Sequence, residues 1–476
     1  MAGIVSYGAY VPFNRLSRAE IAASWGTPKM PGEKAVANYD EDSLTMAVAA
    51  VRDCIKGIGI EGIDGLYFAS TTPPYKEKQT AATIAAVLGM SNEAVTMDFS
   101  GSLRAGTNAV RAAMDAVNSG SAKSVLVCAS DVRLGHPMGS SEMVFGDGAG
   151  ALLIGNENVI AEIEASHTVN NELLDVWRSD QDLFVRSGED RFIMQEGYSR
   201  IIREAVTGAL NRFDLKTDDF IRLALNAPNA RQLTGIAKTL GFDPKTQIQN
   251  QLSMEVGDTG TAMSIMSLVA ALEESKSGER ILLASYGNGC DVLSVKVTGD
   301  TGGSGEKRGM KGHMDEKQMI PRYSKYLRWR ELLDVQPPPR PPKELRQPTP
   351  AAQWRENEKE LRLNGSKCNN CGAPQYPVQR ICMNCSAKDD FEYYSFADKK
   401  AQVSSFSHDY VMETPDPPVT LTVVNFEGGG RIICDMTDRD PDEVKVGMPV
   451  EMTFRRLYYV GGIYNYWWKC KPKRTA

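Results

Sequence analysis

The sequence lacks the segments that would carry the chain into or across a membrane. Its 476 residues contain no apolar run that approaches the roughly 20 residues of a membrane-spanning helix. The first residues also lack the basic stretch followed by an apolar stretch that marks a signal peptide. We therefore expect a cytoplasmic protein with no membrane partner.

An excess of positive charge is also missing. The 54 Lys and Arg residues are outnumbered by 60 Asp and Glu residues, which gives a net charge of −6. Because binding to phosphate backbones needs a basic surface, we expect no nucleic-acid partner. Cysteine occurs nine times, an odd number that fits a reducing compartment better than a disulfide framework.

Strands and helices alternate along roughly the first 300 residues. The length predicts two or three domains, and the alternation predicts an α/β sheet with helices on both faces. Residues 1–165 and 166–335 follow the same plan, which predicts a duplicated core. The expected strands include 65–69, 124–129 and 280–286, and the expected helices include 44–55, 80–88, 198–212 and 261–274.

The stretch 98–107 joins an expected strand to a helical pattern that ends near residue 117. Small residues fall on nearly every face of this helix, so we expect it to be buried against close backbone neighbours. Ser100, Gly101 and Ser102 form the turn at its N-terminus, where unpaired N–H groups and the helix dipole favour a developing anion. Such a turn suits a thioester, and an ordinary Ser N-cap is the alternative.

Beyond the core, composition changes twice. Residues 301–312 are rich in Gly, Ser and Lys and predict a loop, and proline-rich residues 336–355 predict an extended linker. Residues 356–395 carry two CxxC pairs that predict a structural zinc ribbon, with a redox pair as the alternative. The four ligands are Cys368, Cys371, Cys382 and Cys385.

The last segment, residues 396–476, alternates apolar and polar residues between turns rich in Gly, Asp and Pro. This pattern predicts a small antiparallel barrel of the oligomer-binding (OB) fold. Its aromatic cluster near the end of the chain suits a barrel core, a cover over a substrate entrance or a partner site. The cluster consists of Tyr464, Tyr466, Trp467 and Trp468.

Several segments resemble a known family. Residues 3–12 (GIVSYGAYVP), 25–26 and 40–43 are similar to the start of archaeal-type hydroxymethylglutaryl-CoA synthases, and residues 145–151 (FGDGAGA) to initiating β-ketoacyl-carrier-protein synthases. Residues after about 335 resemble the zinc-ribbon and OB-fold domain that accompanies thiolases. The resemblance implies a duplicated thiolase-type αβαβα core, a homodimer and acyl-CoA as the bound substrate.

The positions that match the family's catalytic residues have all changed. The family's nucleophilic Cys falls at Leu103, with Ser102 one position earlier, and its catalytic His falls at Asn226. Its Asn falls at Asp258, and its general acid Glu falls at Thr71. A Ser nucleophile needs an adjacent base, which an Asn side chain cannot supply, whereas Asp258 could act as one if burial raised its pKa.

Further candidates surround these positions. Leu103, Arg104 and Thr71 are expected to contact the substrate. The loop that the resemblance places opposite the nucleophile offers N–H groups to a thioester carbonyl and one phenol as an acid; it comprises Ser285, Tyr286, Gly287 and Asn288. Cys290 is either a displaced nucleophile or a buried thiol. His136 is the one of four histidines whose loop could reach the cavity.

Three hypotheses remain open. The first is an acyl-CoA enzyme that makes or breaks a C–C bond without an acyl-cysteine, for which aldol-type chemistry needs only an acid/base and an oxyanion site. The second is an acyltransferase that uses Ser102 or Cys290. The third is a non-catalytic scaffold that binds acyl-CoA and partners a true thiolase.

Overall fold

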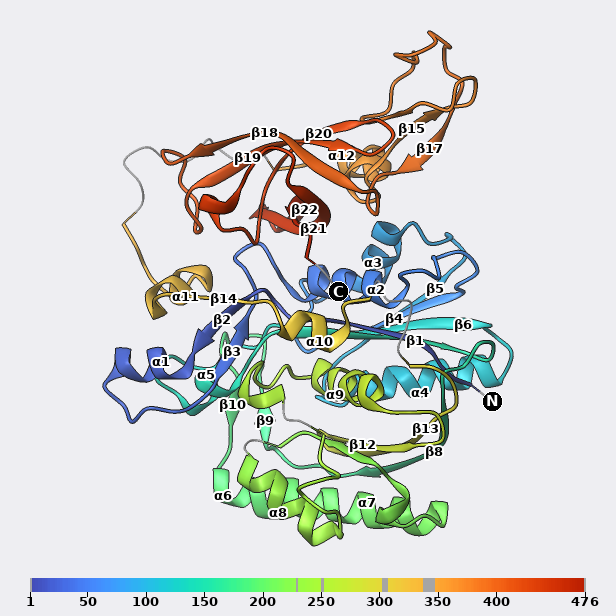
Figure 1. Cartoon of the computed structure of the whole chain (residues 1–476). Helices are drawn as coiled ribbons and strands as arrows, with labels where there is room; N and C mark the ends of the chain where they lie inside the picture. The colour runs from blue at the N-terminus through green and yellow to red at the C-terminus, as the bar shows by residue number, and fades with distance from the viewer. Residues whose placement is uncertain (1, 228–229, 250–251, 302–306, 337–346, 475–476) are drawn as a thin grey trace.

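The computed structural model describes residues 2–227, 230–249, 252–301, 307–336 and 347–474 (Figure 1). The principal strands are β1 (Gly3–Tyr10), β4 (Gly65–Ala69), β5 (Val95–Phe99), β6 (Ser124–Asp131), β7 (Gly148–Gly155), β8 (Ala161–Asn170), β11 (Arg222–Leu225), β12 (Arg280–Tyr286) and β13 (Gly289–Val297). Within the described residues they form one nine-stranded sheet in the order β11-β12-β13-β8-β1-β7-β6-β4-β5. Strands β1 and β8 pair only at Gly3 with Glu162 and Ile4 with Ala161, so the sheet consists of two halves.

Helices cover both halves and fill the space between them (Figure 1). One outer layer contains α2 (Ser43–Cys54) and α3 (Thr80–Leu88), the middle layer α4 (Ala105–Asn118) and α9 (Ala262–Glu274), and the other outer layer α7 (Arg200–Phe213) and α8 (Ala230–Leu240). Helix α2 begins with a capping box between Asp42 and Thr45. The five layers confirm the predicted duplicated αβαβα core.

The two middle helices differ in burial. Helix α9 is buried from Ala262 to Leu272, whereas α4 exposes Asn108, Arg111 and Asp115. The prediction that the helix after residue 104 is buried on nearly every face is therefore wrong for the single chain. Small residues permit close neighbours on a face without guaranteeing that a neighbour is present.

Smaller elements complete the core. They are β2 (Asn14–Ser17), α1 (Arg18–Trp25), β3 (Glu33–Val36), α5 (Ser140–Val144), β9 (Val176–Trp177), β10 (Arg186–Ser187), α6 (Asp190–Phe192), α10 (Gly309–Met314), β14 (Gln318–Met319) and α11 (Tyr323–Trp329). Helix α10 occupies part of the segment 301–312, which the sequence predicted to be loop. Among the described helices, none combines the length and apolar character needed to cross a membrane.

The predicted linker is only partly described. Residues 337–346 lie outside the described residues, and α12 (Pro350–Arg355) is helical where an extended chain was expected; α13 (Asn357–Glu360) follows at the start of the segment predicted as the ribbon. The side chain of Thr349 accepts a hydrogen bond from the Ala352 amide, and Pro350 occupies the first helical position. A Thr cap followed by proline therefore starts a helix at the end of the proline-rich stretch.

The C-terminal part forms two β units, as predicted. The ribbon contains β15 (Asn364–Cys368), β16 (Pro374–Gln375) and β17 (Phe391–Ser395), and it projects from the rest of the molecule (Figure 1). The barrel contains β18 (Ala401–Asp409), β19 (Val419–Phe426), β20 (Arg431–Asp435), β21 (Pro449–Val460) and β22 (Ile463–Pro472) in the order β20-β19-β18-β21-β22. A bridge between Met436 and Cys470 brings its ends together.

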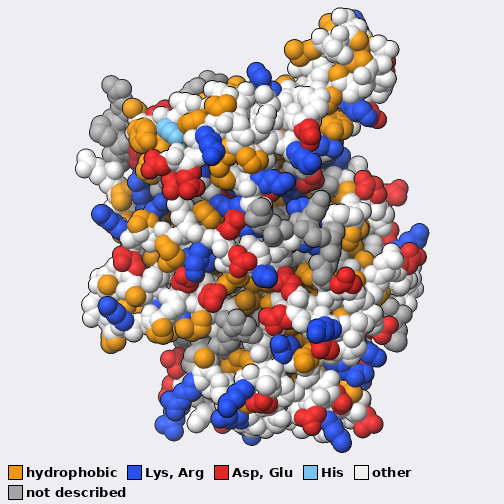
Figure 2. All heavy atoms as spheres, viewed as in Figure 1, with side chains coloured by type: hydrophobic (Ala, Val, Ile, Leu, Met, Phe, Trp, Pro, Cys, Tyr) orange, Lys and Arg blue, Asp and Glu red, His pale blue; other side chains and the backbone are white. Residues whose placement is uncertain are grey.

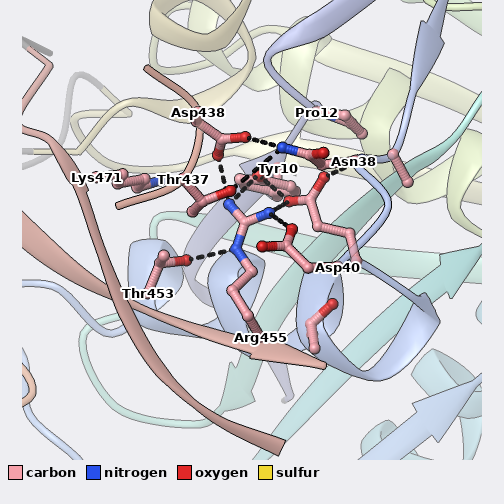
Figure 3. A network of polar contacts seen from close by, with 12 residues as sticks. Tyr10, Pro12, Asn38, Asp40, Thr437, Asp438, Thr453, Arg455 and Lys471 are labelled. Atoms are coloured by element: carbon pink, nitrogen blue, oxygen red, sulfur yellow. Dashed lines mark hydrogen bonds and ion pairs between the residues drawn. The ribbon is translucent and has the colours of Figure 1, made fainter. Parts of the chain in front are cut away.

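A buried charge cluster fastens the barrel to the α/β core (Figure 3). Arg455 on β21 is 1% exposed, and its Nη1 lies 3.1 Å from Asp40 and 2.7 Å from Glu41 of the core. Its Nη2 pairs with Asp438 of the barrel, and Lys469 of the barrel adds a contact of 2.9 Å to Asp40. Because each charge has an opposite partner, the cluster tolerates a burial that would otherwise be costly.

Aromatic residues of the barrel continue this interface. Tyr466 donates to Asp42 at 2.7 Å, and the Tyr464 amide donates to Tyr75 Oη at 2.8 Å. The Trp468 side chain is 1% exposed and donates to the Leu361 carbonyl. The aromatic cluster therefore serves the barrel core and its contact with the α/β core.

On the face seen in Figure 2, basic and acidic side chains are interspersed.

Replacing Arg455 tests whether this charge cluster holds the two parts together. Arg455→Met removes the cation that pairs with the buried carboxylates of Asp40, Glu41 and Asp438. We therefore expect the free energy of unfolding to fall by about 3–5 kcal/mol. Chemical unfolding followed by circular dichroism measures this change. The exposed Arg431, replaced by Met, is the matched control and should have little effect; equal stability of both variants would contradict the account.

Candidate functional site

The turn before α4 touches the loop after β12. Ser102 Oγ donates to the Gly287 carbonyl at 2.9 Å, and the Arg104 amide lies 3.4 Å from Ser102 Oγ. A Cβ at position 287 would lie 3.1 Å from the Leu103 amide nitrogen and 3.0 Å from that of Arg104. Glycine therefore permits this approach, and the structure brings together the two predicted loops. A Ser nucleophile needs a neighbouring base that removes its proton. The Ser102 hydroxyl instead donates a hydrogen bond to a backbone carbonyl, which is too weak a base to remove that proton.

Arg104 clamps these loops through a nearly buried ion pair. Its Nη1 lies 3.0 Å from Asp291, and its Nη2 donates to Asn170 and to the Asn288 carbonyl. Asp291 also accepts a hydrogen bond of 2.6 Å from Thr107. These protein partners hold the guanidinium between the two loops, and the expectation that Arg104 contacts substrate stays a prediction.

Asp131 joins the end of β6 to two neighbouring loops. This carboxylate is fully buried, and its Oδ1 accepts bonds from the Ser70 hydroxyl, the Thr71 amide and both the amide and the hydroxyl of Thr72. Its Oδ2 accepts two bonds of 2.9 Å from Thr261, immediately before α9. The Thr71 hydroxyl is buried without a partner in the described part of the chain.

Asp258 lies beside this hub and is partly accessible. Its Oδ2 is 3.1 Å from Arg133 Nη1, and its Oδ1 accepts the Gly260 amide at 2.9 Å. The Asp258 side chain is 33% exposed, whereas that of Arg133 is 3% exposed and stacks over the Phe145 ring. Salt-bridge and amide partners hold this carboxylate in one orientation while leaving part of it open.

Tyr286 and Asn226 form a third group. Tyr286 donates to Asp175 at 2.8 Å, and burial together with Asp175 raises the pKa of Tyr286 far above its usual range. The Tyr198 hydroxyl donates to the Asn226 carbonyl, and the Tyr198 and Tyr286 rings meet edge to face at 5.4 Å. The Tyr286 phenol is thus engaged with a carboxylate, which does not favour its predicted role as a free acid.

The remaining predicted residues are Cys290, Ser285, Gly287 and His136. Cys290 is fully buried, and burial raises the pKa of its thiol. Ser285 is 2% exposed and pairs with Asp291 between β12 and β13, and the Gly287 amide donates to the Gly289 carbonyl. That amide is therefore unavailable to polarise a thioester. His136 is exposed, and its ring centroid lies 4.3 Å from that of Phe184.

Sequence reasoning missed the residues that hold the site together. Asp131, Arg133, Asp175 and Asp291 were not among the candidates, although each contacts one of the predicted residues. The usable signal was a charged residue at the end of an apolar strand pattern, as at Asp131 after 124–129. Its partners could not be inferred, because they lie about 60 and 130 residues away and spacing carries no information over that range.

The four predicted zinc ligands converge in the ribbon. The sulfur atoms of Cys368, Cys371, Cys382 and Cys385 lie within 4.8 Å of one another. Two of the sulfur pairs are 3.6 Å apart, close to the edge of about 3.8 Å that four Zn–S bonds of about 2.3 Å give in a tetrahedron. Four thiolates fit zinc and leave no open position, so this is a structural site.

Family models match the chain in four places. Residues 97–171 match the model for 3-oxoacyl-[acyl-carrier-protein] synthase III, and residues 210–298 match its C-terminal model. Residues 355–392 match the ChsH2 rubredoxin-like zinc ribbon domain, and residues 396–455 match the ChsH2 C-terminal OB-fold domain. These matches confirm the resemblance noted for both the core and the fused C-terminal part.

Curated relatives and solved structures also resemble this chain. A hydroxymethylglutaryl-CoA synthase of Methanopyrus kandleri is 32% identical over 343 residues, which cover 70% of this chain and 97% of the relative. One of Archaeoglobus fulgidus is 33% identical over 309 residues, 63% of this chain and 90% of the relative. The structure titled PksG, a HMG-CoA synthase from Bacillus subtilis, aligns with a TM-score of 0.62 at 20% identity, over 70% and 89% of the two chains.

The structure titled MvaS in complex with 3-hydroxy-3-methylglutaryl coenzyme A has a TM-score of 0.59 at 18% identity. The alignment covers 71% of this chain and 94% of that one. At such identity the likeness establishes the fold.

Zinc content tests the ribbon site. We expect about one zinc ion per purified chain, and Cys371→Ser should remove it because three thiolates bind zinc far less tightly than four. Elemental analysis by mass spectrometry gives the stoichiometry. Cys54→Ala, which alters a buried cysteine of α2, is the control and should keep the metal. Full zinc content in the Cys371 variant would refute the assignment.

Proposed function

Because the chain belongs to the hydroxymethylglutaryl-CoA synthase family, we propose that it is an enzyme acting on a CoA thioester. In this proposal it makes or breaks a C–C bond next to the thioester, and no acyl group is transferred to the protein. The binding of acyl-CoA follows from the family. The absence of a covalent intermediate is argued from the residues of this chain.

The state of the nucleophile position carries the proposal. Leu103 has no nucleophilic atom, and the neighbouring Ser102 hydroxyl bonds to the Gly287 carbonyl, which cannot act as its base. Cys290 is buried with a raised thiol pKa, which disfavours the reactive thiolate. Acyl transfer through Ser102 or Cys290 would therefore require a rearrangement of these loops, so we rank it second.

We assign Asp258 the role of the general acid–base catalyst. Its carboxylate is partly exposed and is oriented by Arg133 and the Gly260 amide. In the cleavage direction, it takes the proton of a β-hydroxyl group while the Cα–Cβ bond breaks and its electron pair forms the thioester enolate. The enolate then takes a proton at Cα, which yields a shorter acyl-CoA and a carbonyl compound.

The N-terminus of α4 supports the enolate. The helix dipole stabilises negative charge at such a position. The clamp between Arg104 and Asp291 holds this turn against the Gly287 loop. The reverse reaction, addition of the enolate to a carbonyl, uses the same groups, and CoA stays attached to the acyl group throughout.

Turnover of 3-hydroxybutyryl-CoA tests this assignment. We expect acetyl-CoA and acetaldehyde without release of free CoA, and Asp258→Asn should lower kcat/KM by about 100-fold or more because it removes the acid–base group. Chromatography with mass detection follows the CoA esters. Asp243, whose carboxylate only caps a surface turn, gives the matched control Asp243→Asn. A scaffold without catalytic activity would show no turnover, and an acyltransferase would release CoA and lose activity in Ser102→Ala.

We also propose a homodimer through β5. This strand ends the nine-stranded sheet, and Val95 and Met97 on it are 49% and 40% exposed. A free edge with exposed apolar side chains and no proline or lysine is the kind that another strand covers. A second copy of the chain, paired along β5, would cover these two apolar side chains.

Molar mass in solution tests the dimer. Light scattering after size exclusion should give twice the chain mass of 52.2 kDa. Met97→Lys should shift the protein toward the single-chain mass, since a buried lysine at a strand edge opposes pairing. Val446→Lys, at an exposed apolar position of the barrel, is the control. A wild-type monomer would rule the proposal out.

A further inference from the structure

A small polar pocket lies between the end of β11 and α9. Its lining includes Asn226 after β11, Gln249, Leu252 and Ser253 from the segment before α9, and Met263 and Ser267 on α9. The pocket is linked to the proposed site through Tyr198, which donates to the Asn226 carbonyl and packs against Tyr286. These contacts join the pocket to Tyr286, which begins the loop that meets Ser102.

The pocket contains side-chain amides without protein partners. Gln249 is 4% exposed, and both its Oε1 and its Nε2 are buried with no hydrogen-bond partner among the described residues. Asn226 Oδ1 is in the same state. Because leaving buried polar atoms unpaired opposes folding, their presence needs another explanation.

Gln247, two residues earlier, shows what a structural amide does in this segment. Its Oε1 accepts the Asp243 amide, and its Nε2 donates to the Thr217 and Phe220 carbonyls. Gln247 thus ties the chain together with all its polar atoms satisfied. Gln249 makes no such side-chain bonds, although its backbone amide is bonded to the Leu223 carbonyl. The Gln249 side chain is therefore free to serve a ligand.

The unpaired atoms specify the ligand's chemistry. They comprise two acceptors, Asn226 Oδ1 and Gln249 Oε1, and one donor, Gln249 Nε2. A hydroxyl group both donates and accepts, so it can satisfy a donor and an acceptor together. A ketone would use only the donor, and a carboxylate would face two carbonyl oxygens. Among the described residues that line the pocket, none carries a charge.

We propose that Asn226 and Gln249 bind a neutral hydroxyl group on the acyl chain of the substrate, with Gln249 as the residue that sets this specificity. This inference rests on the proposed function, since it presumes that a CoA thioester occupies the neighbouring loops. It narrows the substrate class to hydroxyacyl-CoA esters and disfavours unsubstituted or acidic acyl chains.

Equilibrium binding of three CoA esters with the same chain length tests the inference. Butyryl-CoA, acetoacetyl-CoA and 3-hydroxybutyryl-CoA differ only at Cβ, and dialysis with mass detection measures each free and bound. Because the active enzyme is proposed to cleave 3-hydroxybutyryl-CoA, binding is measured in the Asp258→Asn background, in which we expect the protein to prefer the hydroxyl ester over butyryl-CoA by about 10-fold or more. In Gln249→Leu this preference should disappear, with butyryl-CoA affinity changed by less than about 2-fold, since only the hydrogen bonds are lost.

Stability separates a ligand role from a structural one. Gln249→Leu should keep or raise the melting temperature of the ligand-free chain, because it removes unpaired buried atoms. Gln247→Leu is the matched control, which should melt earlier and keep the hydroxyl preference. Gln249→Met replaces the Leu variant if the latter does not fold.

Two results would overturn the inference in distinguishable ways. If all three esters bind equally and Gln249→Leu changes none of them, the hydroxyl site is refuted while the proposed function stands. If none of the esters binds, the proposed function fails and this inference fails with it.

Discussion

The site depends on how closely the two middle helices and their loops approach one another. At Gly106 on α4, a Cβ atom would lie 2.7 Å from the Thr261 carbonyl, so glycine permits the contact between α4 and the start of α9. Just before α4, the ion pair between Arg104 and Asp291 holds the turn against the Gly287 loop. Both contacts join the two halves of the duplicated core.

The barrel extends this arrangement. Arg455 of the barrel forms buried ion pairs with Asp40 and Glu41 of the core. The barrel can bury these charges only in the orientation that pairs each of them with an opposite charge. The hairpin of β21 and β22 also contacts Tyr75 through Tyr464. Tyr75 follows the loop that carries Thr71, whose amide is bonded to Asp131. The barrel therefore contacts the segment that carries Thr71 directly.

The elements and residues that could be predicted from the sequence are those set by short, local patterns. The strand 65–69 and the helix 80–88 coincide with β4 and α3, because periodicity and flanking glycine mark such elements. The zinc ligands follow from the spacing of four cysteines. The partners of Arg104 and the unpaired amide of Gln249 could not be predicted, because both depend on tertiary packing between distant segments. The exposure of α4 was missed for the same reason.

The central claim is that this chain handles a CoA thioester without becoming acylated. Intact-protein mass spectrometry after incubation with acetyl-CoA and acetoacetyl-CoA, with free CoA measured in parallel, tests it directly. The account predicts an unmodified protein mass and no CoA release, together with measurable binding of both thioesters. An acyl adduct that maps to Ser102 or Cys290 would contradict it and would establish covalent acyl transfer instead.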